Sequence, residues 1–219
     1  MNQNQTSFQT VVLEGYAAER GLSKLGLTMD GLVEVVLRGE SARAGATAHD
    51  PLPAAGWDAY RHRVRALRDI NCPAGWTVLH DAGLEMILSP DKKRVVVTRA
   101  GEDGVGLTGT QPQPKQAVGA STARSVGANL VLDPSWFNKA PSAELKGKPE
   151  VWMLLVERTG DVVCAELSRP SGTEEDGTVS GWLVRILLPN IDLNAPQKKR
   201  PVPEASPPTE IDVPVRRKR

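Results

Sequence analysis

The sequence is poor in cysteine, in aromatic residues and in net charge. Its two cysteines, Cys72 and Cys164, lie far apart with no paired spacing, so neither a disulfide framework nor a zinc ribbon is indicated. The formal net charge of +1 gives no whole-chain reason to expect nucleic acid or an acidic membrane surface as a partner. Reduced thiols are therefore the simplest expectation, and any attraction to a polyanion has to come from a local patch.

Long apolar runs and metal-binding patterns are missing as well. The chain begins MNQNQT, without the basic and apolar regions of a secretory signal, and no run reaches membrane-spanning length. The histidines His49, His62 and His80 show no metal-ligand interval, and a cysteine nucleophile would need a histidine partner that the sequence does not locate. We expect a cytoplasmic protein with no membrane contact and no cofactor.

What the sequence has instead is a dense apolar stretch between Val151 and Leu188. The runs 151–156 and 162–168 are typical of buried strands, and the Gly160-Asp161 turn between them predicts an antiparallel hairpin. A third strand, 182–188, follows a Gly- and Ser-rich loop and is ended by a proline. In that strand we expect Arg185 to lie on the wetter face.

Helices are predicted over residues 28–43, where Thr28 can act as the N-cap, and over residues 56–71. The second helix carries an apolar stripe at spacings of three and four, which predicts its inward face. The members of that stripe are Trp57, Tyr60, Val64 and Leu67. Residues 116–131 predict a weaker third helix that two glycines interrupt.

Three further short apolar runs, at 76–79, 84–89 and 94–99, predict a second meander, with a type I turn at Ser89-Pro90-Asp91-Lys92. Together these patterns predict an α+β fold: a largely antiparallel sheet from two three-stranded meanders, with two or three helices packed on one face. Residues 1–24 are expected to be a flexible arm with a short turn, and residues 25–189 a single α+β domain.

Residues 190–219 are rich in proline and in basic side chains. Large apolar residues are scarce, so the segment cannot bury enough surface to offset the entropy of ordering it, and we predict a disordered tail. Its basic residues, which are candidate contacts for a partner or for nucleic acid, are Lys198, Lys199, Arg200, Arg216, Arg217, Lys218 and Arg219.

The second predicted helix also presents a basic stripe. Arg61, Arg65 and Arg68 recur at helical spacing and therefore share one face, with His62 and Arg63 beside it. Such a face can bind phosphates or an acidic partner. The alternative is an ordinary solvated helix surface, because no helix-turn-helix, zinc finger or RNA-binding aromatic motif accompanies the arginines.

The segment 101–115 is longer than a plain connection needs, and loops of this kind are often functional. A strand running into a glycine-rich loop is the layout from which phosphate cradles are built, but the Gly-Lys-Ser/Thr ending is absent. Glu102 and Asp103 would repel an anion unless a metal lay between them, so they are candidate metal ligands. Pairing of two other carboxylates on the predicted strands, among them Glu85, Glu157 and Glu166, stays an open alternative, although no spacing requires it.

Three stretches carry a resemblance. They are Gly56 to Tyr60 with Val64 to Arg68, Pro73 to Trp76, and Glu166 to Ser168 with Gly181 to Pro189. Over most of residues 28–189, and not in the tail, the chain resembles a group of bacterial proteins of plasmids and other mobile elements that have no known activity. Gly101-Glu102-Asp103-Gly104 matches that group's Gly-Asp-Glu-type loop only loosely. The resemblance implies a role in a mobile element and no site residues.

These observations predict a non-enzymatic interaction protein of a mobile genetic element that binds a macromolecular partner, with a protein favoured over nucleic acid. Two alternatives stay open. One is a divalent-metal-dependent enzyme acting on a nucleotide or nucleic acid, with Glu102 and Asp103 among its ligands. The other is a DNA- or RNA-binding accessory protein that uses the arginine stripe.

Overall fold

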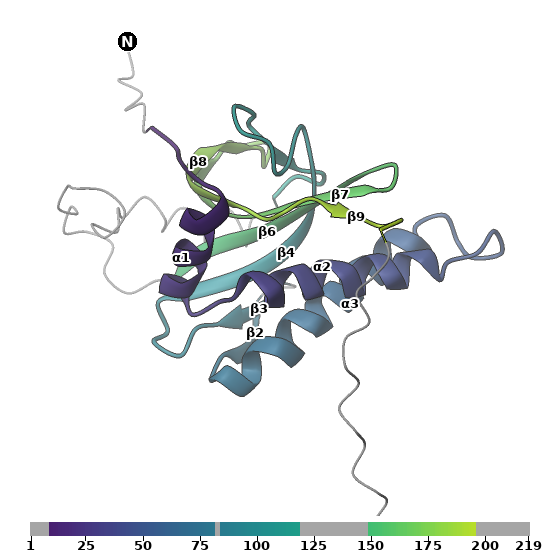
Figure 1. Cartoon of the computed structure of the whole chain (residues 1–219), viewed down its shortest axis with the longest axis horizontal. Coiled ribbons are helices and arrows are strands. Elements are labelled where there is room, and N and C mark those ends of the chain that lie inside the picture. Colours follow the sequence, from purple (N-terminus) through teal and green to yellow (C-terminus); the bar gives the residue numbers. More distant parts are fainter. Residues whose placement is uncertain (1–8, 82–83, 119–148, 196–219) are drawn as a thin grey trace, which may run out of the picture.

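The computed structural model describes residues 9–81, 84–118 and 149–195. Within these ranges the chain forms three α-helices and a nine-stranded sheet (Figure 1). The helices are α1 (Gly15–Leu25), α2 (Met29–Ala44) and α3 (Ala54–Asn71), followed by the 3-10 turn η1 (Cys72–Ala74). The strands are β1 (Val11–Leu13), β2 (Thr77–Asp81), β3 (Leu84–Leu88), β4 (Arg94–Glu102), β5 (Gln113–Pro114), β6 (Glu150–Thr159), β7 (Val162–Thr173), β8 (Val179–Leu187) and β9 (Ile191–Asp192).

The predicted α+β class is confirmed, and the sheet is mixed rather than built from two meanders alone. Its strand order is β1-β8-β7-β6-β4-β3-β2, with β5 paired to β4 and β9 to β7. Each predicted meander is present and antiparallel, β2–β3–β4 and β6–β7–β8. A parallel ladder from Arg94↔Glu150 to Ala100↔Val156 joins them into one sheet, and β1 also pairs in parallel, with β8.

The N-terminal segment differs from the loose arm expected over residues 1–24. From residue 11 it forms β1 and then α1, whose Ala18, Leu22 and Leu25 are buried against the sheet. The helix ends at Gly26, which adopts φ 75° and donates its N–H to the Ser23 carbonyl. The sequence conceals this element because no side chain caps its first turn.

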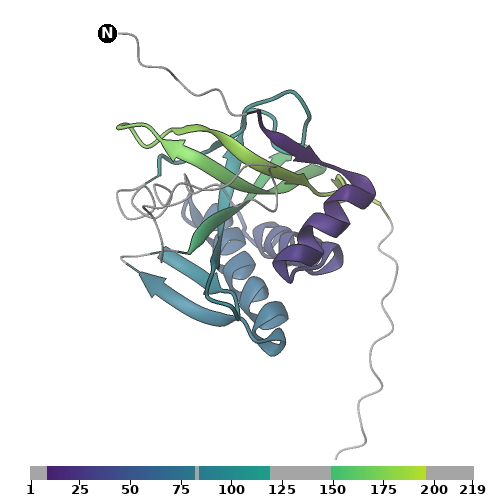
Figure 2. The same ribbon diagram turned by 90° about the vertical axis from the view of Figure 1, so that its left-hand side faces the viewer.

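The helices α2 and α3 are confirmed close to their predicted bounds. Thr28 is the N-cap of α2, and its side chain accepts a hydrogen bond of 3.1 Å from the backbone N–H of Gly31. The two helices form an antiparallel hairpin that is closely packed at Gly39, where an added Cβ would lie 3.1 Å from the carbonyl oxygen of Ala59. With α1 they contribute to one apolar core against alternate residues of the central strands. Figure 2 shows the three helices on the same side of these strands.

The inward face of α3 is rotated relative to the predicted stripe. Its buried residues include Ala59, Arg63, Val64 and Leu67, whereas Trp57 is 63% exposed, so the prediction of an inward Trp57 is wrong. The reason is spatial, because α3 begins near the end of the helical hairpin, and Figure 1 shows the loop between α2 and α3 extending past the sheet.

The opposite face of the sheet is buried too. A second apolar cluster on β4 and β6 includes Val97, Met153 and Leu155, and Val105 and Val118 from the segment after β4 pack onto it. Strands that are covered on both faces carry nearly continuous apolar runs, which explains the lack of alternation in 151–156. The segment 101–118 is therefore a structural layer as well as a connection.

The predicted helix over 116–131 and the predicted disordered tail over 190–219 lie largely outside the described residues. Of the tail, residues 191–192 form β9, which pairs with Val162 and Val163 of β7. The helices in the described part of the chain include none long and apolar enough to cross a membrane.

Candidate functional site

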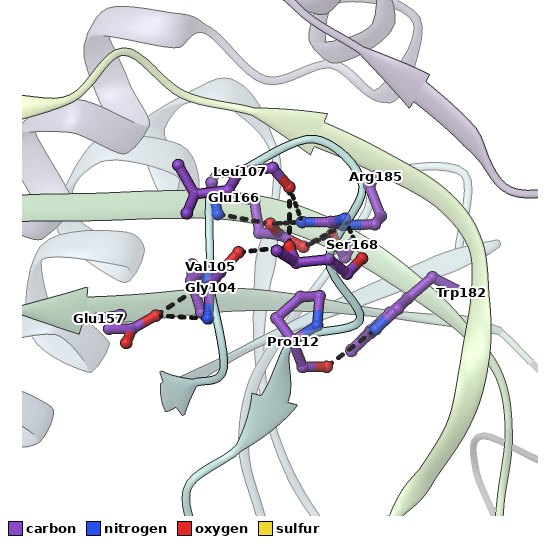
Figure 3. Close-up of polar contacts among 11 residues, drawn as sticks. Gly104, Val105, Leu107, Pro112, Glu157, Glu166, Ser168, Trp182 and Arg185 are labelled. Carbon is purple, nitrogen blue, oxygen red and sulfur yellow. Dashed lines mark hydrogen bonds and ion pairs between the residues drawn. The ribbon is translucent and has the colours of Figure 1, made fainter.

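The loop after β4 is fixed to the sheet by carboxylates that occupy its backbone N–H groups (Figure 3). Glu157 Oε2 accepts hydrogen bonds from the amides of Gly104 (3.1 Å) and Val105 (2.9 Å). Glu166 Oε2 accepts from the amide of Gly106 at 2.8 Å. Successive amides of this kind form an anion cradle, and here the cradle is filled by the protein's own carboxylates. The layout that suggested phosphate binding is thus a feature of the fold.

Arg185 holds the rest of the loop in place through hydrogen bonds to its backbone carbonyls. Its guanidinium contacts Glu166 through Nε–Oε1 (2.9 Å) and Nη2–Oε2 (2.6 Å), and it donates to the carbonyls of Thr110 (2.7 Å) and Leu107 (3.0 Å). Ser168 Oγ donates to Glu166 Oε1 at 2.6 Å. Arg185 is 1% exposed, so the expectation that it lies on a wetter face is wrong. The loop covers this face of the sheet and keeps water away from it. The charges of Arg185 and Glu166 are paired with each other.

Within the described residues, Glu102 and Asp103 have no third side chain beside them that would complete a metal site. Glu102 ends β4 with an exposed side chain, and Asp103 is exposed with a backbone φ of 65°. The carboxylate that lies across from them, Glu157, is engaged with the loop amides. In the part of the chain that the structure describes, no three His, Cys, Asp or Glu side chains gather where they could hold a metal ion.

The remaining carboxylates on the strands are separately engaged rather than paired with one another. Glu85 binds Arg68 and also contacts His80 Nδ1 at 2.7 Å. The hydrogen bond from Arg68 is the main reason why the pKa of Glu85 lies below its usual range. Asp161 accepts from the side-chain amide of Asn194 at 2.8 Å. The arrangement is that of structural ion pairs, and no acid–base pair of carboxylates is formed by these residues.

The three arginines predicted to form a binding stripe on α3 differ in availability. Arg68 is mostly covered and is held by Glu85, so it braces α3 against β3. Arg61 is exposed and forms a salt bridge with Asp58, with 3.2 Å between Nη2 and Oδ1. Arg65 is exposed, and among the described residues it has no acidic partner. The available part of the stripe is therefore Arg61 and Arg65.

An aromatic residue that was predicted to be buried joins these arginines on the surface. Trp57 lies one and two helical turns before Arg61 and Arg65, so the three side chains share one face of α3. Tyr60 packs against Trp57 with ring centroids 5.8 Å apart, and Leu52 in the preceding loop is fully exposed. We call Leu52, Trp57, Tyr60, Arg61 and Arg65 the α3 outer face.

A shallow groove of about 280 Å³ runs beside this face between α2 and α3. It is lined by His62, Arg65 and Asp69 of α3 and by Arg38 of α2. Arg38 is held by Glu34 at 2.9 Å and by Asp69 at 3.5 Å. Sequence reasoning did not find Arg38, because nothing in the α2 sequence indicates which of its faces turns toward α3.

The basic residues of the predicted tail contact, Lys198, Lys199, Arg200, Arg216, Arg217, Lys218 and Arg219, lie outside the described residues. The two cysteines are both free and partly buried. Burial, together with the nearby carboxylate of Glu157, raises the pKa of the Cys164 thiol, which is the opposite of what a nucleophile needs.

Comparison of the chain with protein-family models, with curated proteins and with solved structures gives no match in any of the three. The fold defines an α+β protein with a mixed, mostly antiparallel sheet. Its function has to be inferred from its own residues.

Proposed function

We propose that this protein is a non-enzymatic interaction protein that binds a macromolecular partner, a protein, through the α3 outer face. The observation that carries the proposal is the exposure of Trp57, which is 63% exposed on the same helical stripe as Arg61 and Arg65. Tryptophan, tyrosine and arginine are the residue types that dominate the energy of protein interfaces. A mobile genetic element, which the sequence resemblance implies, remains the proposed setting.

The rigidity of the face also supports a binding role. Trp57 and Tyr60 pack against each other on a regular helix, and Ala59 between them is fully buried against α2. An aromatic pair held in this way loses little side-chain entropy when a partner covers it. Leu52, in the loop that leads into α3, is a further fully exposed apolar side chain.

A protein is favoured over nucleic acid because the face carries little uncompensated charge. Arg61 is paired with Asp58, and Arg38 in the adjacent groove is paired with Glu34 and Asp69. Affinity for a phosphate backbone rests on unpaired cations that release counterions, and Arg65 alone offers such a charge here within the described residues. An exposed indole beside an arginine suits a protein surface with an apolar pocket and an acidic rim.

The test is site-specific photo-crosslinking in cells of the native host. A photoreactive phenylalanine analogue replaces Trp57 in one variant and Tyr16 in a matched control, since Tyr16 is an exposed aromatic residue on α1 with 74% exposure. Because both side chains are exposed, neither replacement should change the free energy of unfolding by more than about 0.5 kcal/mol. We expect one discrete protein adduct from position 57 and none from position 16.

A competition arm makes the result specific. Overexpressed parent protein should suppress the adduct, whereas protein carrying Trp57→Ala with Arg65→Ala should not. Equal crosslinking from both positions, or no adduct from position 57, would count against the proposal. An adduct that disappears on nuclease treatment would assign the face to DNA or RNA instead.

A further inference from the structure

A second cluster of charges lies behind the α3 outer face, where α2, α3 and the end of β6 meet. Its centre is the carboxylate of Glu40, which is 3% exposed. Three guanidinium groups surround that carboxylate: Arg43 Nε at 3.1 Å, Arg63 Nη1 at 3.5 Å and Arg158 Nη1 at 3.5 Å. Three cations thus share one buried anion.

The charges of this cluster do not balance. Among the described residues, the one other carboxylate in contact with the cluster is Asp161, which is 62% exposed and lies 3.9 Å from Arg158 Nη2. Even with Asp161 counted, the cluster carries one excess positive charge. Buried charge is costly unless it is paired and hydrogen-bonded, so an excess cation at this depth favours an additional anion.

Arg63 shows the deficit most clearly. Its side chain is 2% exposed, and its Nε has no hydrogen-bond partner within the part of the chain that the structure describes. Its nearest carboxylate oxygen, at 3.5 Å, lies beyond the 2.7–2.9 Å that is usual for a charge-assisted hydrogen bond. Burial is the main reason why the pKa of Arg63 is lowered to about 10, with Glu40 acting in the opposite direction.

The same fold contains a buried arginine whose needs are met, and the contrast is informative. Arg185, 1% exposed, makes two contacts of 2.6 and 2.9 Å to Glu166 and two more to loop carbonyls. Arg63 is equally buried, yet it shares a single carboxylate with Arg43 and Arg158 at longer distances. The described residues pair the guanidinium of Arg185 fully, whereas they leave the Nε of Arg63 without a hydrogen-bond acceptor.

We infer that Arg43, Arg63 and Arg158 form a binding site for a doubly charged oxyanion of the phosphate type, either free or as the end of a phosphomonoester. Arg43 and Arg158 have side chains that are 29% and 34% exposed, so the anion approaches from their side. Arg63 supplies the inner donor. Planar guanidinium forks match the oxygen geometry of such an anion. A phosphate group with two negative charges is also attracted more strongly to the three arginines than a carboxylate, which carries one.

The site differs from the α3 outer face in its ligand and in its residues. Bound anion would tie the β6–β7 hairpin, through Arg158, to α2 and α3. It would therefore stabilise the folded state in proportion to its concentration. This inference does not rest on the proposed protein-binding role, because none of its three arginines belongs to the α3 outer face.

The test is a titration of the full chain followed by NMR of arginine side chains and by thermal unfolding. Sodium phosphate and glycerol phosphate are compared with sodium chloride at equal ionic strength. We expect the Nε–H resonance of Arg63 to shift in a saturable way and the melting temperature to rise with either phosphate. Binding of inorganic phosphate alone would mean that the anion is enclosed, whereas equal binding of both would place the site at an open surface.

The variants Arg43→Gln and Arg158→Gln change partly exposed side chains and leave the buried Arg63 in place. Each should weaken phosphate binding by about tenfold or more, since each removes charge-assisted hydrogen bonds. Arg20→Gln, an exposed control on α1 outside both the cluster and the α3 outer face, should bind as the parent does. A resonance and a melting temperature that respond to phosphate no more than to chloride would overturn the site. So would binding that survives in both glutamine variants.

Discussion

Arg185 of β8 and Glu166 of β7 form a buried, two-point ion pair beneath the loop that follows β4. The pair does more than join two strands, because Glu166 also accepts from the Gly106 amide and Arg185 donates to two loop carbonyls. The loop, the sheet and the ion pair are therefore one polar unit on the side opposite the helices.

The first prediction concerns this unit. Arg185→Met should lower the free energy of unfolding by about 3–5 kcal/mol, because it leaves the Glu166 carboxylate buried without its cation. Urea denaturation followed by tryptophan fluorescence measures the change. Arg65→Met is the matched control at an exposed arginine and should stay within about 0.5 kcal/mol of the parent. Equal, small effects of the two substitutions would contradict the role assigned to the pair.

A second prediction separates local from global stability. Glu157→Ala removes the acceptor for the amides of Gly104 and Val105, so these two amides should exchange with deuterium faster than in the parent. Amides in the centre of β6 should keep their protection. Asp161→Ala, on the exposed turn of the same hairpin, is the control and should leave the exchange of both loop amides unchanged.

Replacement of two helical glycines by alanine should change the free energy of unfolding in opposite directions. In an exposed helix, Gly→Ala is stabilising by roughly 0.5–1 kcal/mol, and Gly56 has open space around its missing Cβ. At Gly39 the added Cβ would lie 2.4 Å from Arg63 Cγ and 3.1 Å from the Ala59 carbonyl oxygen. Gly39→Ala should therefore destabilise by about 1–3 kcal/mol. Thermal unfolding of both variants tests the pair, and stabilisation by Gly39→Ala would show that α2 and α3 are less tightly packed.

The elements of this fold were predictable where a local signal exists. Thr28 marks the start of α2, Gly160 marks the β6–β7 turn, and the 151–156 run gives a buried strand. The parallel β4–β6 ladder was not predictable, because the sequence pattern of one strand does not specify the direction of the strand that pairs with it. The seven residue pairs of this ladder are not indicated by the sequence pattern of either strand alone.

The candidate site shows the same limit. Helical spacing correctly placed Arg61 and Arg65 on one exposed face. It could not tell that Arg68 is bound by Glu85, that Trp57 lies beyond the cover of the sheet, or that Arg185 is buried under a loop. Each of these depends on what another segment does in space. An arginine within an apolar strand signals either solvent or a buried partner, and the sequence does not distinguish the two.

A fourth prediction is a dependence of stability on pH. The Arg68 contact lowers the pKa of Glu85 in the folded state, so the unfolded chain binds a proton more readily at this position. The contribution is therefore present above the ordinary pKa of 4.5 and is lost as the pH falls through the folded-state pKa. Because Glu85 is partly exposed, solvent screening keeps this contribution small.

Its measurement is a comparison of Glu85→Gln with the parent by urea denaturation at several pH values. The variant should be less stable than the parent at pH 7, and the difference should shrink in acid. Asp58→Asn, which alters the exposed Arg61 pair, should differ little from the parent throughout. A Glu85→Gln difference that stays constant from neutral pH into strong acid would contradict the assignment.

A fifth prediction concerns thiol reactivity. Burial, aided by the Glu157 carboxylate, raises the pKa of Cys164, so little thiolate is present near neutral pH. Alkylation of Cys164 by iodoacetamide, followed by mass spectrometry, should be slower than that of glutathione in the same tube. The alkylation rate of Cys164 should keep rising with pH until the pH passes its raised pKa, which lies above the usual pKa of a cysteine thiol. In concentrated urea the difference from glutathione should vanish, and its persistence there would rule out the folded environment as its cause.

The pairing of β1 with β8 sets an order of events during synthesis. Thr10, next to β1, donates its hydroxyl to the carbonyl of Trp182, 172 residues later in the chain. At ribosomal speeds, β1 waits on the order of ten seconds or more before its partner strand is made. During that interval the apolar side of α1, with Leu22 and Leu25, also lacks the β8 surface that it later contacts. Among the described strands, the first to be synthesised is thus among the last to be paired, and β1 stays without its neighbouring strand until β8 has been made.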